Sequence, residues 1–301
     1  MGVILYKIIP VVLIFFFGYF MKLTNIFTKK DGDSLLKVIF YVALPALIFL
    51  SVFKMKFSVE YLLLPVIALL VIAGTFCFSY LSGKLLKLEK ASFGSYLLGS
   101  LIMNSSFTYP FLIAAKGEES LALASLFDFG NTAMVPTFMY YLACKHNKES
   151  PSSIAMLKKF LYSPPLLALL IALFSNLFHL EFPGVVEEFF RLLGFMLVPL
   201  MMLALGIYFS PVTFKLAPVI SAVFIRMGVG LLLAFLFIHL FDLKGLSRTV
   251  VLVLSSAPSG MATLVFSTLE DLNRELAASI ISYSVIFGIF FIPLLLLFVA
   301  D

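Results

Sequence analysis

Charged side chains are scarce in this sequence. Asp, Glu, Lys and Arg make up 12% of its 301 residues, whereas hydrophobic residues make up 62%. A soluble domain carries about 25% charged residues, so a chain of this composition cannot cover a surface that faces water. The scarcity excludes a soluble protein and predicts an integral membrane protein in contact with the lipid bilayer. The net charge of +5 is too modest to indicate a nucleic-acid partner.

Residues that bind metals or form nucleophiles are also few. The two cysteines, Cys77 and Cys144, form no CxxC pair, and the three histidines are scattered. A disulfide framework and a metal site are therefore not expected. The apolar segments contain no HExxH motif, no paired carboxylates and no Ser/His arrangement. We expect no catalytic residues and no cofactor, and the sequence does not predict an enzyme.

Long apolar runs dominate what remains. A membrane span needs about 20 mostly apolar residues. The candidate spans cover residues 3–21, 35–53, 61–83, 92–115, 119–143, 160–178, 186–209, 216–241, 248–268 and 275–299. The first run lacks a small-x-small cleavage site, so we interpret it as a span rather than a signal peptide. The prediction is an all-α membrane protein of ten spans.

Prolines recur at similar places in the two halves of the chain. The pairs are Pro10 with Pro164, Pro45 with Pro199, Pro65 with Pro218, Pro110 with Pro258 and Pro136 with Pro293, which lie 148 to 157 residues apart. This pattern predicts a duplicated five-span unit over 1–143 and 160–301, joined by a polar linker over 144–159. Because five is odd, the second copy would be inverted, an architecture found in many secondary transporters. Alternatively, the prolines only mark kinks in long apolar helices.

The lysines and arginines indicate an orientation. With the N-terminus outside, thirteen of them fall on the cytoplasmic side and seven on the outer side, and the excess comes from the first half. Positive residues concentrate in cytoplasmic loops. The distribution therefore predicts that the N-terminus and the C-terminus both lie outside.

Two of the apolar runs are interrupted by polar residues around a proline. They read LIMNSSFTYPFLIAA, Leu101 to Ala115, and VLSSAPSGMATLVFS, Val253 to Ser267. Broken backbone survives in a membrane only inside protein or beside a wet cavity, so we expect the two breaks to meet. Half-helix N-termini suit an anion, and half-helix C-termini suit a cation or a polar group. The alternative is that the Ser and Thr side chains bond back to their own helices.

The breaks supply the candidate substrate-binding residues. They are Asn104, Ser105, Ser106, Thr108, Tyr109, Pro110, Ser256, Pro258, Ser259 and Gly260.

Asp128 and Arg226 lie deep within predicted spans, and Asn131 shares a helix face with Asp128. A charge near the membrane midplane costs at least ~2.5 kcal/mol, so such residues are functional candidates. Asp128 could carry a proton, bind a coupling cation such as Na⁺, or pair with Arg226. Arg226 could instead face an anionic substrate. A purely structural Asp128–Arg226 pair is the alternative to all of these roles.

Four motifs resemble the auxin efflux carrier family, which includes plant PIN proteins and bacterial malate or malonate carriers. The motifs are LPALIF (Leu44 to Phe49), NSSFTYP (Asn104 to Pro110), SLFDFGN (Ser125 to Asn131) and the closing segment from Ala257 to Leu297. The resemblance spans essentially the whole chain. NSSFTYP carries Ser, Thr and Tyr where glycine is common in the family.

The resemblance implies a 5+5 inverted repeat like that of bile-acid symporters and NhaA, with broken spans four and nine crossing. Spans one, two, six and seven would form a scaffold and a homodimer contact. The other spans would move as an elevator that carries a small organic anion, bound near Asn104. The short linker suits a carrier of the bacterial inner membrane. Two other functions stay open: a sodium-coupled symporter of the bile-acid type, and a ligand sensor that works through a partner protein.

Overall fold

The structure is a computed structural model that describes residues 2–54, 59–146, 162, 164–209 and 216–299. Within these ranges the chain is helical, and its one β-type contact is an isolated bridge. Helical elements lie in all ten predicted ranges. The predicted linker lies outside the described residues from position 147 onward.

The first half contains five helical stretches. They are α1 (Gly2–Leu23); α2 (Lys29–Val38), the π-helical η1 (Ile39–Ala43) and α3 (Leu44–Phe53); η2 (Val59–Leu62) and α4 (Leu63–Leu85); α5 (Lys90–Leu101) and α6 (Ser105–Lys116); and α7 (Glu119–Met134), the π-helical η3 (Val135–Met139) and α8 (Tyr140–His146).

The second half also contains five. They are α10 (Pro164–Leu177); α11 (Gly184–Phe195) and α12 (Leu197–Tyr208); α13 (Leu216–Val223), the π-helical η4 (Phe224–Val229) and α14 (Gly230–Leu240); α15 (Gly245–Ser255) and α16 (Ala262–Leu269); and α17 (Arg274–Phe298).

Among the described residues, four helical stretches are long and apolar enough to cross a membrane: Leu63–Leu85, Gly184–Ile207, Leu216–Leu240 and Arg274–Phe298. Shorter apolar helices accompany them, and many large apolar side chains on both kinds of helix are exposed. Apolar residues on the outside of a helical bundle match a lipid surrounding rather than water. The chain is an integral membrane protein.

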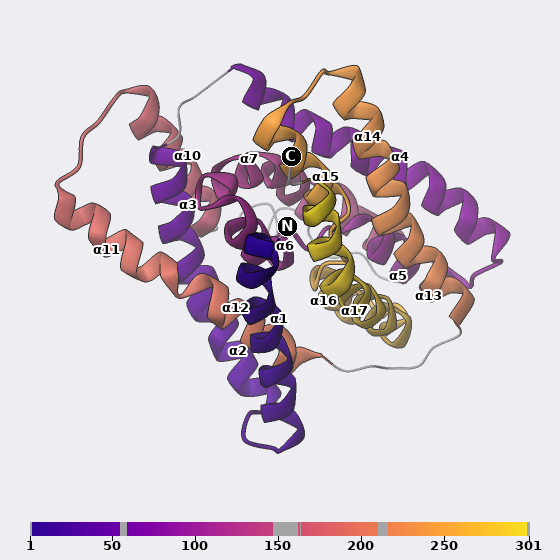
Figure 1. Cartoon of the computed structure of the whole chain (residues 1–301). Coiled ribbons are helices and arrows are strands. Elements are labelled where there is room, and N and C mark those ends of the chain that lie inside the picture. Colours follow the sequence, from indigo (N-terminus) through magenta and orange to yellow (C-terminus); the bar gives the residue numbers. More distant parts are fainter. Residues whose placement is uncertain (1, 55–58, 147–161, 163, 210–215, 300–301) are drawn as a thin grey trace.

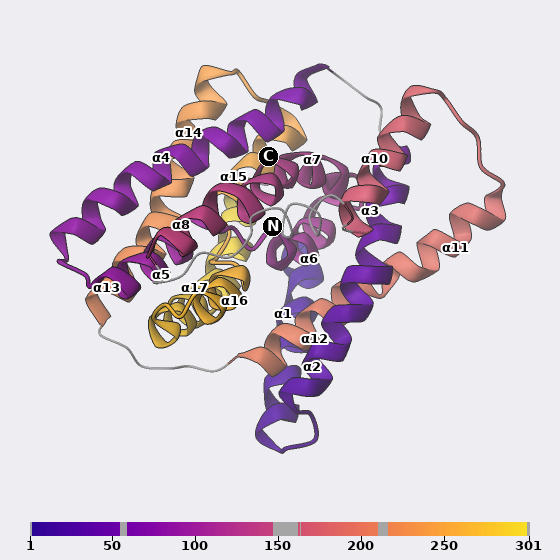
Figure 2. The same cartoon turned by 180° about the vertical axis from the view of Figure 1, so that it is seen from behind.

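The helices pack as two groups. We call α1, α2, α3, α10, α11 and α12 the scaffold group, and α4–α8 together with α13–α17 the core group. Within the scaffold group α1 packs on α12, and α3 packs on α10 and α11. Within the core group α4 packs on α5 and α7, and α17 packs on α5 and α13. The two groups lie side by side in Figure 1, and Figure 2 shows the same division from behind.

Each group is held together by close backbone approaches. A Cβ atom on Gly206 of α12 would collide with the backbone of Phe15 in α1, within the scaffold group. A Cβ atom on Gly130 of α7 would lie 2.5 Å from the carbonyl oxygen of Pro65 in α4, within the core group. Small residues let helices approach this closely in membranes, where the packing contact replaces a hydrophobic driving force.

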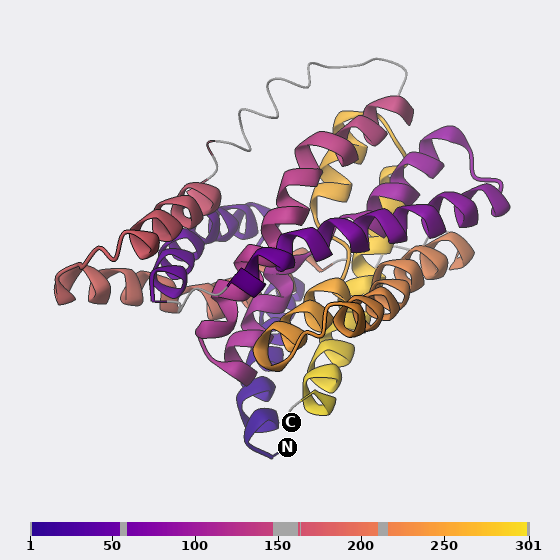
Figure 3. The same cartoon turned by 90° about the horizontal axis from the view of Figure 1, so that it is seen from above.

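The boundary between the groups is made differently. The core group touches the scaffold group where α6 meets α1 and α12, where α7 meets α3, and where α17 meets α1. None of the hydrogen bonds, ion pairs or ring contacts assigned between described residues joins the two groups. In the described part of the chain, these helix–helix contacts form the boundary without an assigned hydrogen bond or ion pair across it. The start of α1 and the end of α17 lie close together on one side of the molecule (Figure 3).

Candidate functional site

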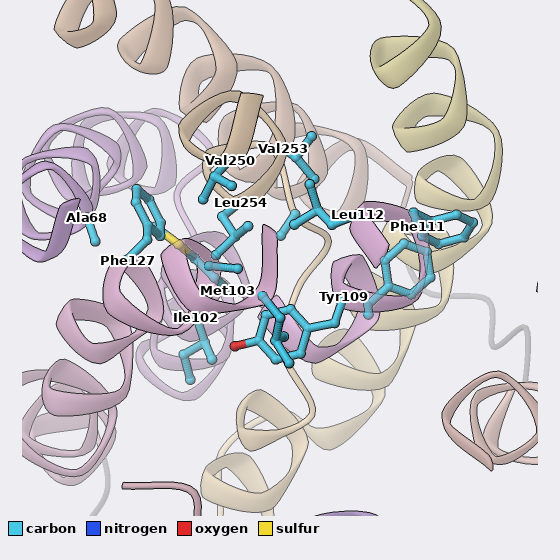
Figure 4. Packing of buried hydrophobic residues seen from close by; sticks show 14 of the residues in the cluster. Ala68, Ile102, Met103, Tyr109, Phe111, Leu112, Phe127, Val250, Val253 and Leu254 are labelled. Atoms are coloured by element: carbon cyan, nitrogen blue, oxygen red, sulfur yellow. The ribbon is translucent and has the colours of Figure 1, made fainter. Parts of the chain in front are cut away.

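The two interrupted runs meet inside the core group. Residues 102–104 separate α5 from α6, and residues 256–261 separate α15 from α16. Met103 and Ser259 form an antiparallel bridge, in which Asn104 N donates to Pro258 O at 2.8 Å and Gly260 N donates to Ile102 O at 2.9 Å. Four half-helix ends therefore gather at one place. Figure 4 shows buried side chains, including Met103, Phe127 and Leu254, packed around it.

The first break is shorter than the sequence suggests. The unwound part was expected to extend from Asn104 to Pro110, but α6 begins at Ser105 and contains Pro110. Asn104 is the reason, because its Oδ1 accepts a hydrogen bond from Phe107 N at 3.2 Å and caps the helix. The bridge also shows that Pro110 and Pro258 are not equivalent. Pro258 lies in the break itself, opposite Asn104, whereas Pro110 lies inside a helix.

Asp128 of α7 lies beside the start of α6, and four side chains donate to its carboxylate. Oδ1 accepts from Ser105 Oγ and, at 2.9 Å, from Asn131 Nδ2. Oδ2 accepts from Tyr109 Oη at 3.2 Å and from Thr132 Oγ1 at 3.1 Å. No described lysine or arginine is within ion-pair distance of this carboxylate. The Asp128 carboxylate is therefore stabilised by neutral hydrogen-bond donors and by the partial positive charge of the α6 N-terminus.

Asn131 connects the carboxylate to the break. Its Oδ1 accepts from Met103 N at 3.3 Å, and its Nδ2 donates to Met103 O at 3.4 Å. The side-chain amide thus pairs with both backbone groups of the residue at the centre of the first break. Asn131 therefore contacts both the first break and Asp128.

Arg226 is on the other side of the crossing. It is fully buried in η4, and its guanidinium donates to Leu101 O at 3.2 Å, Ala257 O at 3.3 Å and Ser255 O at 2.5 Å. Asp128 is not among its partners, so the Asp128–Arg226 pair considered from the sequence is not formed. Each of its three nitrogens donates to a backbone carbonyl group.

The other predicted polar residues differ in whether their side chains contact the crossing. Ser259 belongs to the crossing, since its Oγ donates to Gly99 O at 2.5 Å and its N donates to Ser284 Oγ at 3.0 Å. Thr108 and Ser256 instead bond back to carbonyl groups of their own helices, at 2.7 and 2.6 Å. Ser106 is half-buried in the first turn of α6.

Buried polar atoms without a partner remain near the crossing. Nδ2 of Asn104 has none, and neither do Oγ of Ser255 at the end of α15 and Oγ1 of Thr263 in the first turn of α16. Buried donors of this kind are rare in folded proteins and call for an explanation. A bound polar ligand would satisfy them.

Sequence reasoning missed Thr132 and Ser284. Thr132 follows Asp128 by four residues, so helical spacing alone puts it on the same face. Ser284 could not be found in this way, because its partner Ser259 lies on another element. The described residues contain no cluster of three or more His, Cys, Asp or Glu that could hold a metal ion.

Apolar helices that enclose a carboxylate and two paired helix breaks define an integral membrane protein of the transporter class. The model of the membrane transport protein family matches residues 3–296, and the chain belongs to this family, which is the auxin efflux carrier family that its motifs resemble.

Two curated relatives agree with this assignment. An uncharacterized transporter of Methanocaldococcus jannaschii is 32% identical over 298 residues, which cover 95% of this chain and 96% of the relative. An uncharacterized transporter of Methanothermobacter thermautotrophicus is 28% identical over 294 residues, which cover 95% of each chain. Both relatives are archaeal, so the prediction of a bacterial inner membrane rests on the short linker alone.

Proposed function

We propose that this protein is a secondary active transporter that carries a small organic anion, such as a carboxylate, across the membrane by alternating access. One observation carries the proposal: the buried, unpartnered Nδ2 of Asn104 lies at the paired helix breaks, directly before the N-terminus of α6. A helix N-terminus favours negative charge, and an amide N–H donates to carboxylate oxygens. Ser106, in the first turn of α6, adds a backbone N–H group near the same end.

Asp128 suggests how transport is coupled to an ion gradient. A carboxylate substrate would bring a second negative charge into the buried site that contains Asp128, and a proton carried together with the substrate would cancel that charge. The surrounding hydroxyls of Ser105, Tyr109 and Thr132 can accept a hydrogen bond as well as donate one. One of them could turn to accept a hydrogen bond from a protonated Asp128. We therefore propose H⁺ as the coupling ion.

The boundary between the two groups supports elevator-type movement. Both groups have close internal contacts and hydrogen bonds, whereas no hydrogen bond assigned between described residues joins them. A boundary without directional bonds allows one body to slide along the other at small cost. The core group, which contains the site, would move, and the scaffold group would stay fixed as the homodimer contact.

Uptake into proteoliposomes tests the proposal. The purified protein would be offered radiolabelled dicarboxylates and aromatic carboxylates, with an inward pH gradient and with or without sodium. We expect saturable uptake of at least one carboxylate that nigericin abolishes by collapsing the pH gradient. Absence of uptake for every carboxylate, with protein that is folded and inserted, would refute the assignment.

Sodium coupling is the second candidate, since the oxygen atoms around Asp128 resemble the ligands of a hard cation. Uptake that requires sodium and survives nigericin would favour the bile-acid type of symporter. Specific carboxylate binding without any flux would favour the ligand sensor instead.

A further inference from the structure

Arg226 has the largest side chain among the fully buried residues of the described chain. Its three carbonyl partners belong to two different half-helices. Leu101 is the last residue of α5, Ser255 is the last residue of α15, and Ala257 lies in the break that follows α15. One side chain from a third element therefore contacts the C-terminal ends of both broken helices.

The positive charge of the guanidinium matches the partial negative charge of the two helix C-termini. Each helix C-terminus carries a partial charge of roughly −0.5, so two converging ends present about one negative charge. Their last carbonyl groups lack intrahelical donors and need partners from elsewhere. The guanidinium supplies one positive charge and donates from all three of its nitrogens. The hydrogen bonds to these carbonyl groups offset the cost of burying the guanidinium charge in the membrane.

A glycine makes the contact possible. A Cβ atom on Gly230, one turn after Arg226, would collide with Ser255 O and lie 2.9 Å from Arg226 Nη2. Only glycine allows α14 to approach the end of α15 closely enough for the guanidinium to reach that carbonyl group.

We infer that Arg226 is a positioning residue that ties the C-terminal ends of α5 and α15 together and holds the two breaks in register. The Arg226 guanidinium also serves as a permanent cation at the crossing. It occupies the carbonyl groups that would otherwise attract a coupling cation, which leaves the Asp128 cluster as the place where such an ion can act. This inference does not depend on which substrate is carried.

Chemical rescue of Arg226→Ala tests it. The purified variant would be heated with methylguanidinium chloride or with the same concentration of tetramethylammonium chloride, which has equal charge but no N–H donors. We expect the variant to melt well below the parent protein. Methylguanidinium, unlike tetramethylammonium, should raise its Tm by about 2 °C, the shift that a ligand near ten times its Kd gives to a chain of this size. Arg248→Ala removes an exposed arginine and should show no rescue.

The possible outcomes decide the question. If Arg226→Ala does not fold alone, recovery of monodisperse protein when methylguanidinium is present during extraction supports the inference. Uptake that is lost in the variant and restored by methylguanidinium supports it further. Wild-type Tm and uptake without any guanidinium, or failure of methylguanidinium to restore Tm, folding or uptake, overturns it. Because Tm requires no substrate, failure here is distinct from failure of the proposed transport function.

Discussion

At the scale of the residue, Asn104 has two separate tasks. Its Oδ1 caps α6, while its Nδ2 is buried without a partner. A substitution that keeps the cap and removes the amide donor separates these tasks.

Asn104→Asp is that substitution, and Asn104→Ala removes both groups. A lost hydrogen bond to a charged group costs about 1.5–3 kcal/mol, so we expect both variants to bind a carboxylate substrate about ten- to a hundredfold more weakly. Asn104→Asp should keep the parent Tm, whereas Asn104→Ala should lose ~1 kcal/mol of stability with its cap. Substrate Kd and thermal melts measure the two effects. Unchanged affinity in Asn104→Asp would show that the amide does not contact substrate.

Asp128 is the residue through which pH should act. Asp128→Asn keeps the size of the side chain but cannot take up a proton, so uptake should no longer depend on the pH gradient. Thr132→Val is the matched variant, because it removes one donor at 3.1 Å and keeps the carboxyl group. It should shift the pH profile without flattening it. A pH profile that survives intact in Asp128→Asn would assign the carboxylate a structural role.

The sequence indicated where buried polar residues lie, whereas their part in substrate binding stays a prediction. The depth of Asp128, the polar stretch after Leu101 and the one around Pro258 all indicated buried polar positions. The role of Arg226 was not readable, because its three partners are backbone carbonyl groups 29 to 125 residues away. No side-chain pattern encodes a contact to backbone.

At the scale of the element, the breaks depend on how α14 meets α15. Gly230→Ala would push Ser255 O away from the guanidinium, because the new Cβ atom has no free space. Overpacking of this kind costs about 1–3 kcal/mol, and we expect a lower Tm and strongly reduced uptake.

Gly228→Ala is the control in the same π-helical segment. There a Cβ atom meets only the side chain of Phe224, at 3.1 Å, and that ring can turn aside. The variant should retain near-parent uptake and Tm. Equal losses in both variants would mean that the π-helical segment tolerates no side chain at all, and that the contact with Ser255 is not special.

The elements also show where sequence reasoning loses precision. Composition and apolar run length located helices in all ten predicted ranges, because burial in lipid demands such runs. The edges of the first break were misplaced, because the capping side chain of Asn104, rather than Pro110, decides where α6 begins. Proline spacing suggested the repeat, but it paired Pro110, which lies inside α6, with Pro258, which lies in the second break.

At the scale of the whole molecule, the two groups should be separable by substitution. Gly206→Ala drives a Cβ atom into the α1 backbone within the scaffold group, at a cost of about 1–3 kcal/mol. The site lies in the core group, so substrate Kd should stay near the parent value while Tm and uptake fall. Isothermal titration and uptake distinguish these effects.

Gly184→Ala is the control for this experiment. It lies at the start of α11 in the same group, and a Cβ atom there meets nothing within 4 Å. It should leave Tm, Kd and uptake unchanged. A large loss of affinity in Gly206→Ala would contradict the division into two independent groups.

The boundary between the groups has one more consequence. Contact without directional bonds does not specify a preferred depth for the core group relative to the scaffold group. If the core group moves as proposed, that depth would depend on how well the long apolar helices α4 and α17 match the hydrocarbon thickness around them, since mismatch costs fractions of a kcal/mol per Å. Acyl-chain length would then bias which side of the bilayer the pocket faces at rest. The lipid would then influence the equilibrium between the two orientations of the core group, in addition to solvating the protein.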